Sequence, residues 1–164
     1  MSIDAQLYRQ VLGHFPTGVT VVTGIDGDEP VGFTIGSFTS VSLDPPLVGF
    51  LPMIDSDRWN RIRRSGAFCV NVLAADQAAL CWNFSKSSIT DPFEGVGWKP
   101  APTTGSPAID GAIAWIDCDI HQVVDAGDHH FVMGLVRDLA HTPAEHEPAP
   151  LLFYRGKLGG FIQH

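Results

Sequence analysis

The feature that most constrains the fold is a series of short segments in which β-branched and apolar residues alternate with polar ones. Such segments occupy residues 18–25, 31–43, 46–52, 67–73, 112–126, 129–141 and 151–161. A period of two residues is typical of strands with one buried face. Turn signals separate most of these segments, so the strict strand–helix–strand repeat of a parallel sheet is missing. The pattern predicts a mainly β fold with short helices, an antiparallel barrel.

A few segments have helical character instead. Residues 4–15 place apolar side chains at helical spacing after Asp4, a possible N-cap. Residues 56–66 predict a short helix capped by Ser or Asp and ended by Gly, and the alanine-rich residues 75–85 predict another. Residues 85–108 are rich in Ser, Thr, Gly and Pro, which predicts an extended surface loop.

Composition limits the classes of function. The 164 residues predict one domain over residues 1–164, and 18 acidic against 10 basic side chains give a net charge of −8. This charge argues against a general nucleic-acid or anionic-membrane surface. We find neither a signal peptide nor an apolar run of the roughly 18–20 residues that span a bilayer. Three widely spaced cysteines without a C-x-x-C pair indicate neither a disulfide framework nor a metal site, and favour a cytoplasmic protein.

Residues 32–50, GFTIGSFTSVSLDPPLVGF, combine strand-forming residues with bare backbone and small hydroxyl groups. Glycine in a strand allows another group to approach the backbone closely, and Ser and Thr supply donors and acceptors without bulk. One interpretation is a flat, hydrogen-bonding wall for a planar polar ligand. The alternative is structural, with bulges at Gly32 and Gly36 and a solvated hydroxyl face. No G-x-G-x-x-G, Walker A or G-x-S-x-G motif offers another site.

Six blocks of the chain resemble, in family order, the short-chain flavin reductase family. They are FPTGVTVVT (15–23), residues 32–50, SGAFCVNVL (65–73), FEGVGW (93–98), AGDHHFVMGLV (126–136) and PLLFYRGKLGGF (150–161). The resemblance implies a split β-barrel of the FMN-binding type and a homodimer with the flavin near the subunit interface. It also implies an NAD(P)H-dependent reductase that supplies reduced FMN or FAD to a separate flavin-dependent monooxygenase.

The resemblance further implies which residues bind the cofactors. Those matched to flavin-binding segments are Thr34, Ile35, Gly36 and Ser37 at the ring, Ser40, Val41 and Ser42 toward the phosphate side, Phe50, Leu51, Ser56 and Trp59 on the next strand and turn, and Ser85, Lys86 and Ser87 at the phosphate. His129 matches the nicotinamide side, while Tyr154 and Arg155 border both cofactors. On the residues alone, a solvated surface lysine is the favoured interpretation of Lys86, and a structural role is the favoured interpretation of His129.

The implied reaction is hydride transfer from NADH or NADPH to the flavin, which needs no side-chain nucleophile and no metal. Two other classes remain open. A pyridoxamine-phosphate-oxidase-like enzyme has a related barrel. It would require a stronger basic cluster to bind two phosphate groups, which a chain with 10 basic residues does not readily supply. A non-catalytic flavin- or haem-binding protein is the other.

Overall fold

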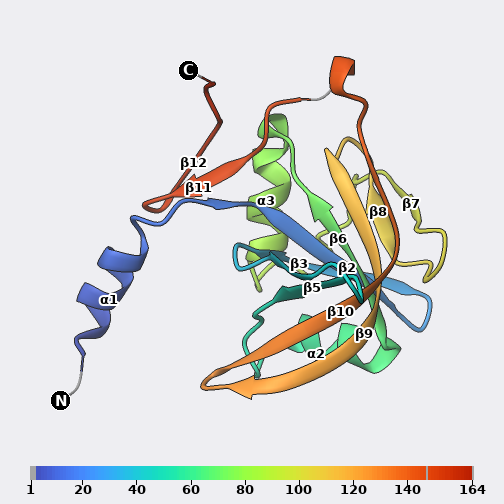
Figure 1. Cartoon of the computed structure of the whole chain (residues 1–164), viewed down its shortest axis with the longest axis horizontal. Coiled ribbons are helices and arrows are strands. Elements are labelled where there is room, and N and C mark those ends of the chain that lie inside the picture. Colours follow the sequence, from blue (N-terminus) through green and yellow to red (C-terminus); the bar gives the residue numbers. More distant parts are fainter. Residues whose placement is uncertain (1–2, 147, 164) are drawn as a thin grey trace.

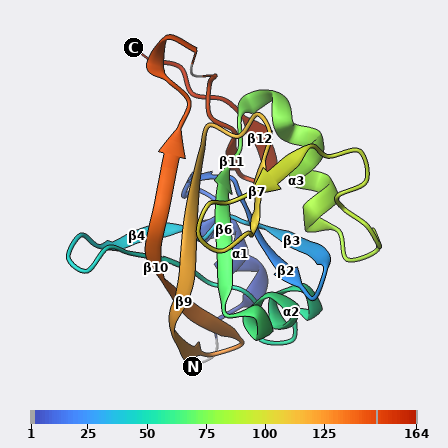
Figure 2. The same ribbon diagram turned by 90° about the vertical axis from the view of Figure 1, so that its right-hand side faces the viewer.

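Seven antiparallel strands form one curved sheet, which is an open barrel (Figures 1 and 2). The computed structural model describes residues 3–146 and 148–163. The strands of this sheet are β2 (Thr20–Asp26), β3 (Glu29–Ile35), β4 (Thr39–Ser42), β5 (Leu47–Phe50), β6 (Ala67–Val72), β9 (Ala114–Ala126) and β10 (His129–His141). Their order is β3-β2-β6-β9-β10-β5-β4, so β3 and β4 are consecutive in the chain but lie at opposite edges. The barrel is therefore split between them.

Outside the barrel, the described residues form two small sheets and three α-helices. One small sheet joins β1 (Thr17–Gly18), β11 (Leu152–Tyr154) and β12 (Lys157–Gly159), and the other pairs β7 (Trp98–Pro100) with β8 (Pro107–Ile109). The helices are α1 (Ala5–Leu12), α2 (Asp57–Ser65) and α3 (Ala78–Ser85), with 3₁₀ turns η1 (Ala75–Gln77) and η2 (Ala144–His146). In the described part of the chain, no helix is both long enough and apolar enough to cross a membrane.

This architecture confirms the predicted split barrel but corrects three boundaries. The strand expected over residues 31–43 divides into β3 and β4. The last expected strand is a hairpin, because Arg155 and Gly156 both adopt positive φ angles of 49° and 77° and turn the chain. The expected surface loop of residues 85–108 contains β7 and part of β8, and its apolar side chains Phe93 and Ala101 are buried.

Side chains fill the barrel interior, centred on the ring of Phe50. Its centroid lies 5.1 Å from that of Phe68 and 5.7 Å from that of Trp59, both in edge-to-face contact. The indole Nε1 of Trp59 donates a 2.9 Å hydrogen bond to Nδ1 of buried His130, so the polar atom of this large side chain is satisfied. The interior consequently leaves no room for a ligand of the size of a flavin.

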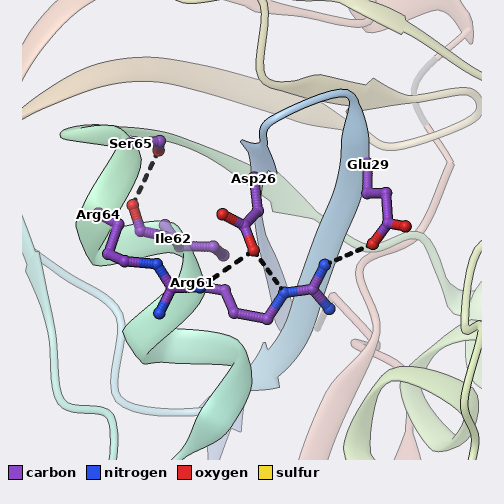
Figure 3. Close-up of polar contacts among 6 residues, drawn as sticks. All are labelled: Asp26, Glu29, Arg61, Ile62, Arg64 and Ser65. Atoms are coloured by element: carbon purple, nitrogen blue, oxygen red, sulfur yellow. Dashed lines mark hydrogen bonds and ion pairs between the residues drawn. The ribbon is translucent and has the colours of Figure 1, made fainter.

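Ion pairs fasten α2 to the β2–β3 hairpin (Figure 3). Arg61 bridges the two strands, with 2.7 Å contacts from Nε to Asp26 Oδ2 and from Nη2 to Glu29 Oε2. Arg64 adds a 3.1 Å contact to Asp26. The helix begins at Ser56, whose Oγ accepts from the backbone N–H of Trp59, and ends at Gly66 with φ 78°. The helix therefore lies where the sequence predicts it, and Ser56 is the N-cap of the two candidates.

Replacing Asp26 with Asn should lower stability at neutral pH but not in acid. The hydrogen bond from Arg61, aided by the nearby Arg64 charge, lowers the pKa of Asp26 in the folded state. A carboxyl group whose pKa falls on folding stabilises the fold above its unfolded-state pKa, and this stabilisation is lost as the pH falls through the folded-state pKa. We expect a lower urea midpoint for Asp26→Asn at pH 7, with the difference from wild type closing below about pH 4. Asp28→Asn, at the exposed hairpin tip, is the control, and a pH-independent defect in Asp26→Asn would contradict the ion-pair explanation.

Candidate functional site

A cavity of about 470 Å³ lies outside the filled barrel, beside the end of β3. Its lining residues are Val19, Phe33, Thr34, Ile35, Gly36, Leu51, Pro52, Met53, Ser56, Cys81, Trp82, Phe84, Ser85, His129 and Phe153. They come from the residue between β1 and β2, the end of β3 and the residue after it, the segment between β5 and α2, the helix α3, the start of β10, and β11. A mostly apolar cavity with a few polar groups is the usual form of a site for an organic ligand.

The hydroxyl groups of the glycine-interrupted segment tie the cavity walls together. Thr34 Oγ1 donates a 2.7 Å hydrogen bond to the carbonyl of Cys81, which joins β3 to α3. Ser37 Oγ accepts a 2.9 Å hydrogen bond from the backbone N–H of Leu51, which joins the end of β3 to the segment after β5. Both hydroxyls are therefore engaged within the chain, so they shape the walls rather than stand free.

The two glycines of this segment allow close packing. A Cβ atom on Gly32 would lie 2.8 Å from Cε1 of Phe84, so bare backbone is what lets α3 approach the sheet. A Cβ atom on Gly36 would lie 3.3 Å from Oγ1 of Thr17, so it points toward β1. The β2–β3 pairing keeps its register through Gly32, which rules out the bulge expected there as an alternative. Gly36 also lines the cavity, where its backbone faces any ligand.

His129 and His130 are neighbours that point to opposite sides of β10. His129 lines the cavity with 37% of its side chain exposed, and its Nδ1 lies 2.7 Å from Oδ1 of Asp128. This hydrogen bond, the largest cause of a lowered pKa of Asp128, favours a proton on Nδ1 and leaves Nε2 as the free ring nitrogen. His130 is 5% exposed and holds Trp59. Alternation along the strand accounts for the difference.

Seven of the residues matched to cofactor segments meet at this cavity: Thr34, Ile35, Gly36, Leu51, Ser56, Ser85 and His129. Lys86 and Ser87 are exposed and follow Ser85 directly in the chain. Ser37 lines a different cavity, together with Phe15 and Thr17. Ser40, Val41 and Ser42 lie on the edge strand β4, away from the cavity lining. Tyr154 and Arg155 lie in the C-terminal hairpin, where they line a neighbouring cavity with Pro16.

Phe50 and Trp59 require a correction. Neither side chain has exposed surface, so neither can contact a ligand in this structure. Phe50 alternates with its cavity-lining neighbour Leu51, and Trp59 lies on the inner face of α2, one turn from Ser56. A match of sequence segments identifies the strand and the helix, but it does not determine which of their side chains face the core.

Sequence reasoning missed the apolar rim of the cavity. Met53, Trp82 and Phe153 keep 50%, 42% and 38% of their surface exposed, although large apolar side chains normally bury more. An aromatic face at the mouth of a cavity suits stacking against a planar ring. Trp82 lies in an alanine-rich helical segment, and its spacing alone gave no signal that it would face the cavity.

Comparison with known proteins identifies the family of this chain. The model of the flavin reductase like domain matches residues 12–161. A flavin reductase of Pseudomonas putida is 51% identical over 98% of this chain and 92% of its own length. The flavin-dependent monooxygenase reductase subunit HsaB of Mycobacterium tuberculosis is 48% identical over 96% of this chain and 83% of its own.

A solved structure extends the similarity to the fold. The NADH:FAD oxidoreductase SgcE6 of Streptomyces globisporus C-1027, in complex with NAD and FAD fragments, superposes with a TM-score of 0.89 and 38% identity. The match covers 99% of this chain and 97% of SgcE6. Family model, relatives and fold together confirm the resemblance seen in the sequence: this chain belongs to the flavin reductase-like family.

Proposed function

We propose that the protein is an NAD(P)H-dependent flavin reductase that supplies reduced FMN or FAD to a separate monooxygenase component. The observation that carries the proposal is the family match over residues 12–161 on a chain whose cavity is bounded by the matched segments. Relatives named as a flavin reductase and as a monooxygenase reductase subunit support the reaction and the partner. The complex of SgcE6 with NAD and FAD fragments supports the two cofactors.

The residues of the cavity suit a flavin. Gly36 offers bare backbone to a planar ring, and the apolar side chains of Leu51 and Trp82 provide surfaces for its faces. Ser56 and Ser85 both line the cavity, and Lys86 follows Ser85 at the surface, so a phosphate beside Ser85 would meet a hydroxyl group and a cation. We assign the ring to the β3 side and the phosphate to the α3 end.

The chain itself acts by holding two rings together. The acceptor for the hydride of the nicotinamide would be supplied by a bound flavin. The cavity walls must keep the reacting atoms about 3–3.5 Å apart and exclude water from the space between them. The free Nε2 of His129 is placed to accept a hydrogen bond from the nicotinamide carboxamide, and the rim side chains Met53, Trp82 and Phe153 cover the mouth.

Steady-state oxidation of NADH and NADPH, each with FMN, FAD and riboflavin, tests the reductase proposal. We expect oxidation of a reduced nicotinamide that depends on flavin and produces reduced flavin under anaerobic conditions. No flavin-dependent rate with either nucleotide would overturn the proposal. A yellow protein without such a rate would indicate a non-catalytic flavin carrier, a Soret band a haem protein, and turnover of pyridoxamine phosphate the related oxidase.

Replacing His129 with Ala should raise the KM for the nicotinamide roughly tenfold, the effect of losing one hydrogen bond of about 1.4 kcal/mol. The dissociation constant of the flavin should hardly change. His141→Ala, exposed at the far end of β10, is the control. His130→Ala is unsuitable as a control because it would leave the buried Trp59 indole without its acceptor. Weaker flavin binding with an unchanged nicotinamide KM would refute the role given to His129.

A second copy of this chain is the partner we propose for α1. The helix contains no buried residue and extends away from the rest of the chain in Figure 1. Leu7, Tyr8, Val11 and Leu12 are 53–57% exposed, although Asp4 caps the helix and it is well formed. An ordered helix with an uncovered apolar face needs another surface, and a closed symmetric pair is the commonest way to provide one.

Sedimentation of the wild-type protein at micromolar concentration should therefore give a dimer. Two charges in the apolar face, Leu7→Asp with Val11→Asp, should shift it to a monomer without unfolding the barrel. Gln6→Glu, on the opposite face by helical spacing, should remain dimeric. A wild-type monomer, or an unaltered dimer in the double variant, would contradict the proposed interface.

The cytoplasm is the compartment we propose. Cys69, Cys81 and Cys118 are free and buried, and burial raises the pKa of the Cys69 thiol to about 12. Such thiols are poor nucleophiles and form no stabilising cross-link, which suits a reducing environment.

A further inference from the structure

The guanidinium group of Arg58 is bound to backbone carbonyl groups rather than to a carboxylate. Nη1 donates to the carbonyl of Phe84 at 2.9 Å, and Nη2 donates to those of Lys86 and Ile89 at 3.1 and 2.5 Å. Within residues 3–146 and 148–163, no acidic side chain forms an ion pair with it. The half-buried guanidinium group donates three hydrogen bonds to the backbone of residues 84–89, and these bonds attach α2 to that segment.

The end of α3 suits this cation. Helix α3 ends at Ser85, and the carbonyl groups at a helix C-terminus carry partial negative charge. Burial lowers the pKa of Arg58, yet an arginine keeps its charge at any physiological pH. The planar fork reaches three carbonyls at once, which a lysine ammonium on a flexible stem does less well.

The segment that Arg58 holds includes the residues assigned to the flavin phosphate. Ser85 lines the cavity, and Lys86 and Ser87 follow it, exposed and outside any strand. The bonds to the carbonyls of Lys86 and Ile89 bracket Ser87 on both sides. Within the segment itself, a weaker 3.3 Å backbone bond joins Ile89 to Lys86.

Arg58 also connects this segment to another wall of the same cavity. It lies in the first turn of α2, two residues after Ser56, which caps the helix and lines the cavity. The ion pairs of Arg61 fix α2 on the β2–β3 hairpin. Arg58 therefore connects residues 84–89 to a helix that is itself fixed on the sheet.

We propose that Arg58 is a positioning residue that holds residues 85–87 in the arrangement that binds the phosphate of the flavin. This inference rests on the proposed flavin reductase function. Arg58 acts through Lys86 and the two serines, and it has no contact with the flavin in this assignment. Loss of the Arg58 hydrogen bonds should leave the cavity walls around the flavin ring intact. Residues 85–87 would then no longer be held in place to bind the phosphate.

Binding titrations with FMN and riboflavin test this assignment, because the two differ by the phosphate alone. In Arg58→Ala we expect the dissociation constant of FMN to rise roughly tenfold, and that of riboflavin to change by less than about twofold. Arg58→Lys should lie between, since it keeps the charge but not the fork. Arg63→Ala, an exposed arginine near the end of the same helix, is the matched control. Arg58→Lys carries the test if the Ala variant does not fold.

A double-mutant cycle with Lys86→Ala tests whether Arg58 affects FMN binding through Lys86. If Arg58 acts by placing Lys86, Arg58→Ala should weaken FMN binding much less in the Lys86→Ala background than in wild type. Trypsin cleavage after Lys86 should also be faster in Arg58→Ala than in Arg63→Ala, whether or not flavin is present. This second readout reports loop order directly.

The outcomes separate the two levels of the proposal. Wild-type protein that binds neither flavin would overturn the proposed function and this inference together. Wild-type protein that prefers FMN to riboflavin, with that preference unchanged in Arg58→Ala, would overturn the inference alone. Equal weakening of FMN and riboflavin binding would show that Arg58 is merely structural. Additive effects in the cycle would overturn the positioning of Lys86 by Arg58.

Discussion

The packing around Phe50 is the constraint on which the rest of this structure depends. Its contacts with Phe68 and Trp59 fill the barrel. The hydrogen bond from Trp59 to His130 gives the buried indole N–H a partner that it would otherwise lack. A ligand is thereby confined to the outside of the sheet. The cavity forms there because the barrel does not close between β3 and β4, and α3 covers the end of β3.

The small residues Gly32 and Thr34 of β3 allow α3 to pack closely against the strand. Bare backbone at Gly32 admits the ring of Phe84, and the Thr34 hydroxyl binds the carbonyl of Cys81 on the same helix. The segment that looks like a ligand wall is therefore first a docking surface for α3. Residues 33–36 of this segment also line the cavity.

The sequence predicts the periodic parts of the fold well, because alternation and helix caps are local signals. It predicts the short helix α2 over residues 56–66 and its end at Gly66. It does not predict the turn at Arg155, since an arginine with positive φ is unusual, nor the three carbonyl partners of Arg58, which come from a segment 26–31 residues away. The family resemblance locates the segments of the site. Whether the Phe50 side chain points into the core or toward the cavity depends on tertiary packing, which the sequence does not reveal.

The N-terminal segment depends on the end of the chain for its place in the fold. Strand β1 pairs with β11, the carbonyl of Gly13 accepts a 3.1 Å hydrogen bond from the N–H of Arg155, and Phe153 of β11 completes the cavity rim. During synthesis on a ribosome, the seven strands of the barrel emerge before this partner exists. Because β11 follows all seven barrel strands in the chain, the barrel core can pack while β1 still lacks its partner, and the cavity gains its Phe153 wall only when β11 pairs with β1.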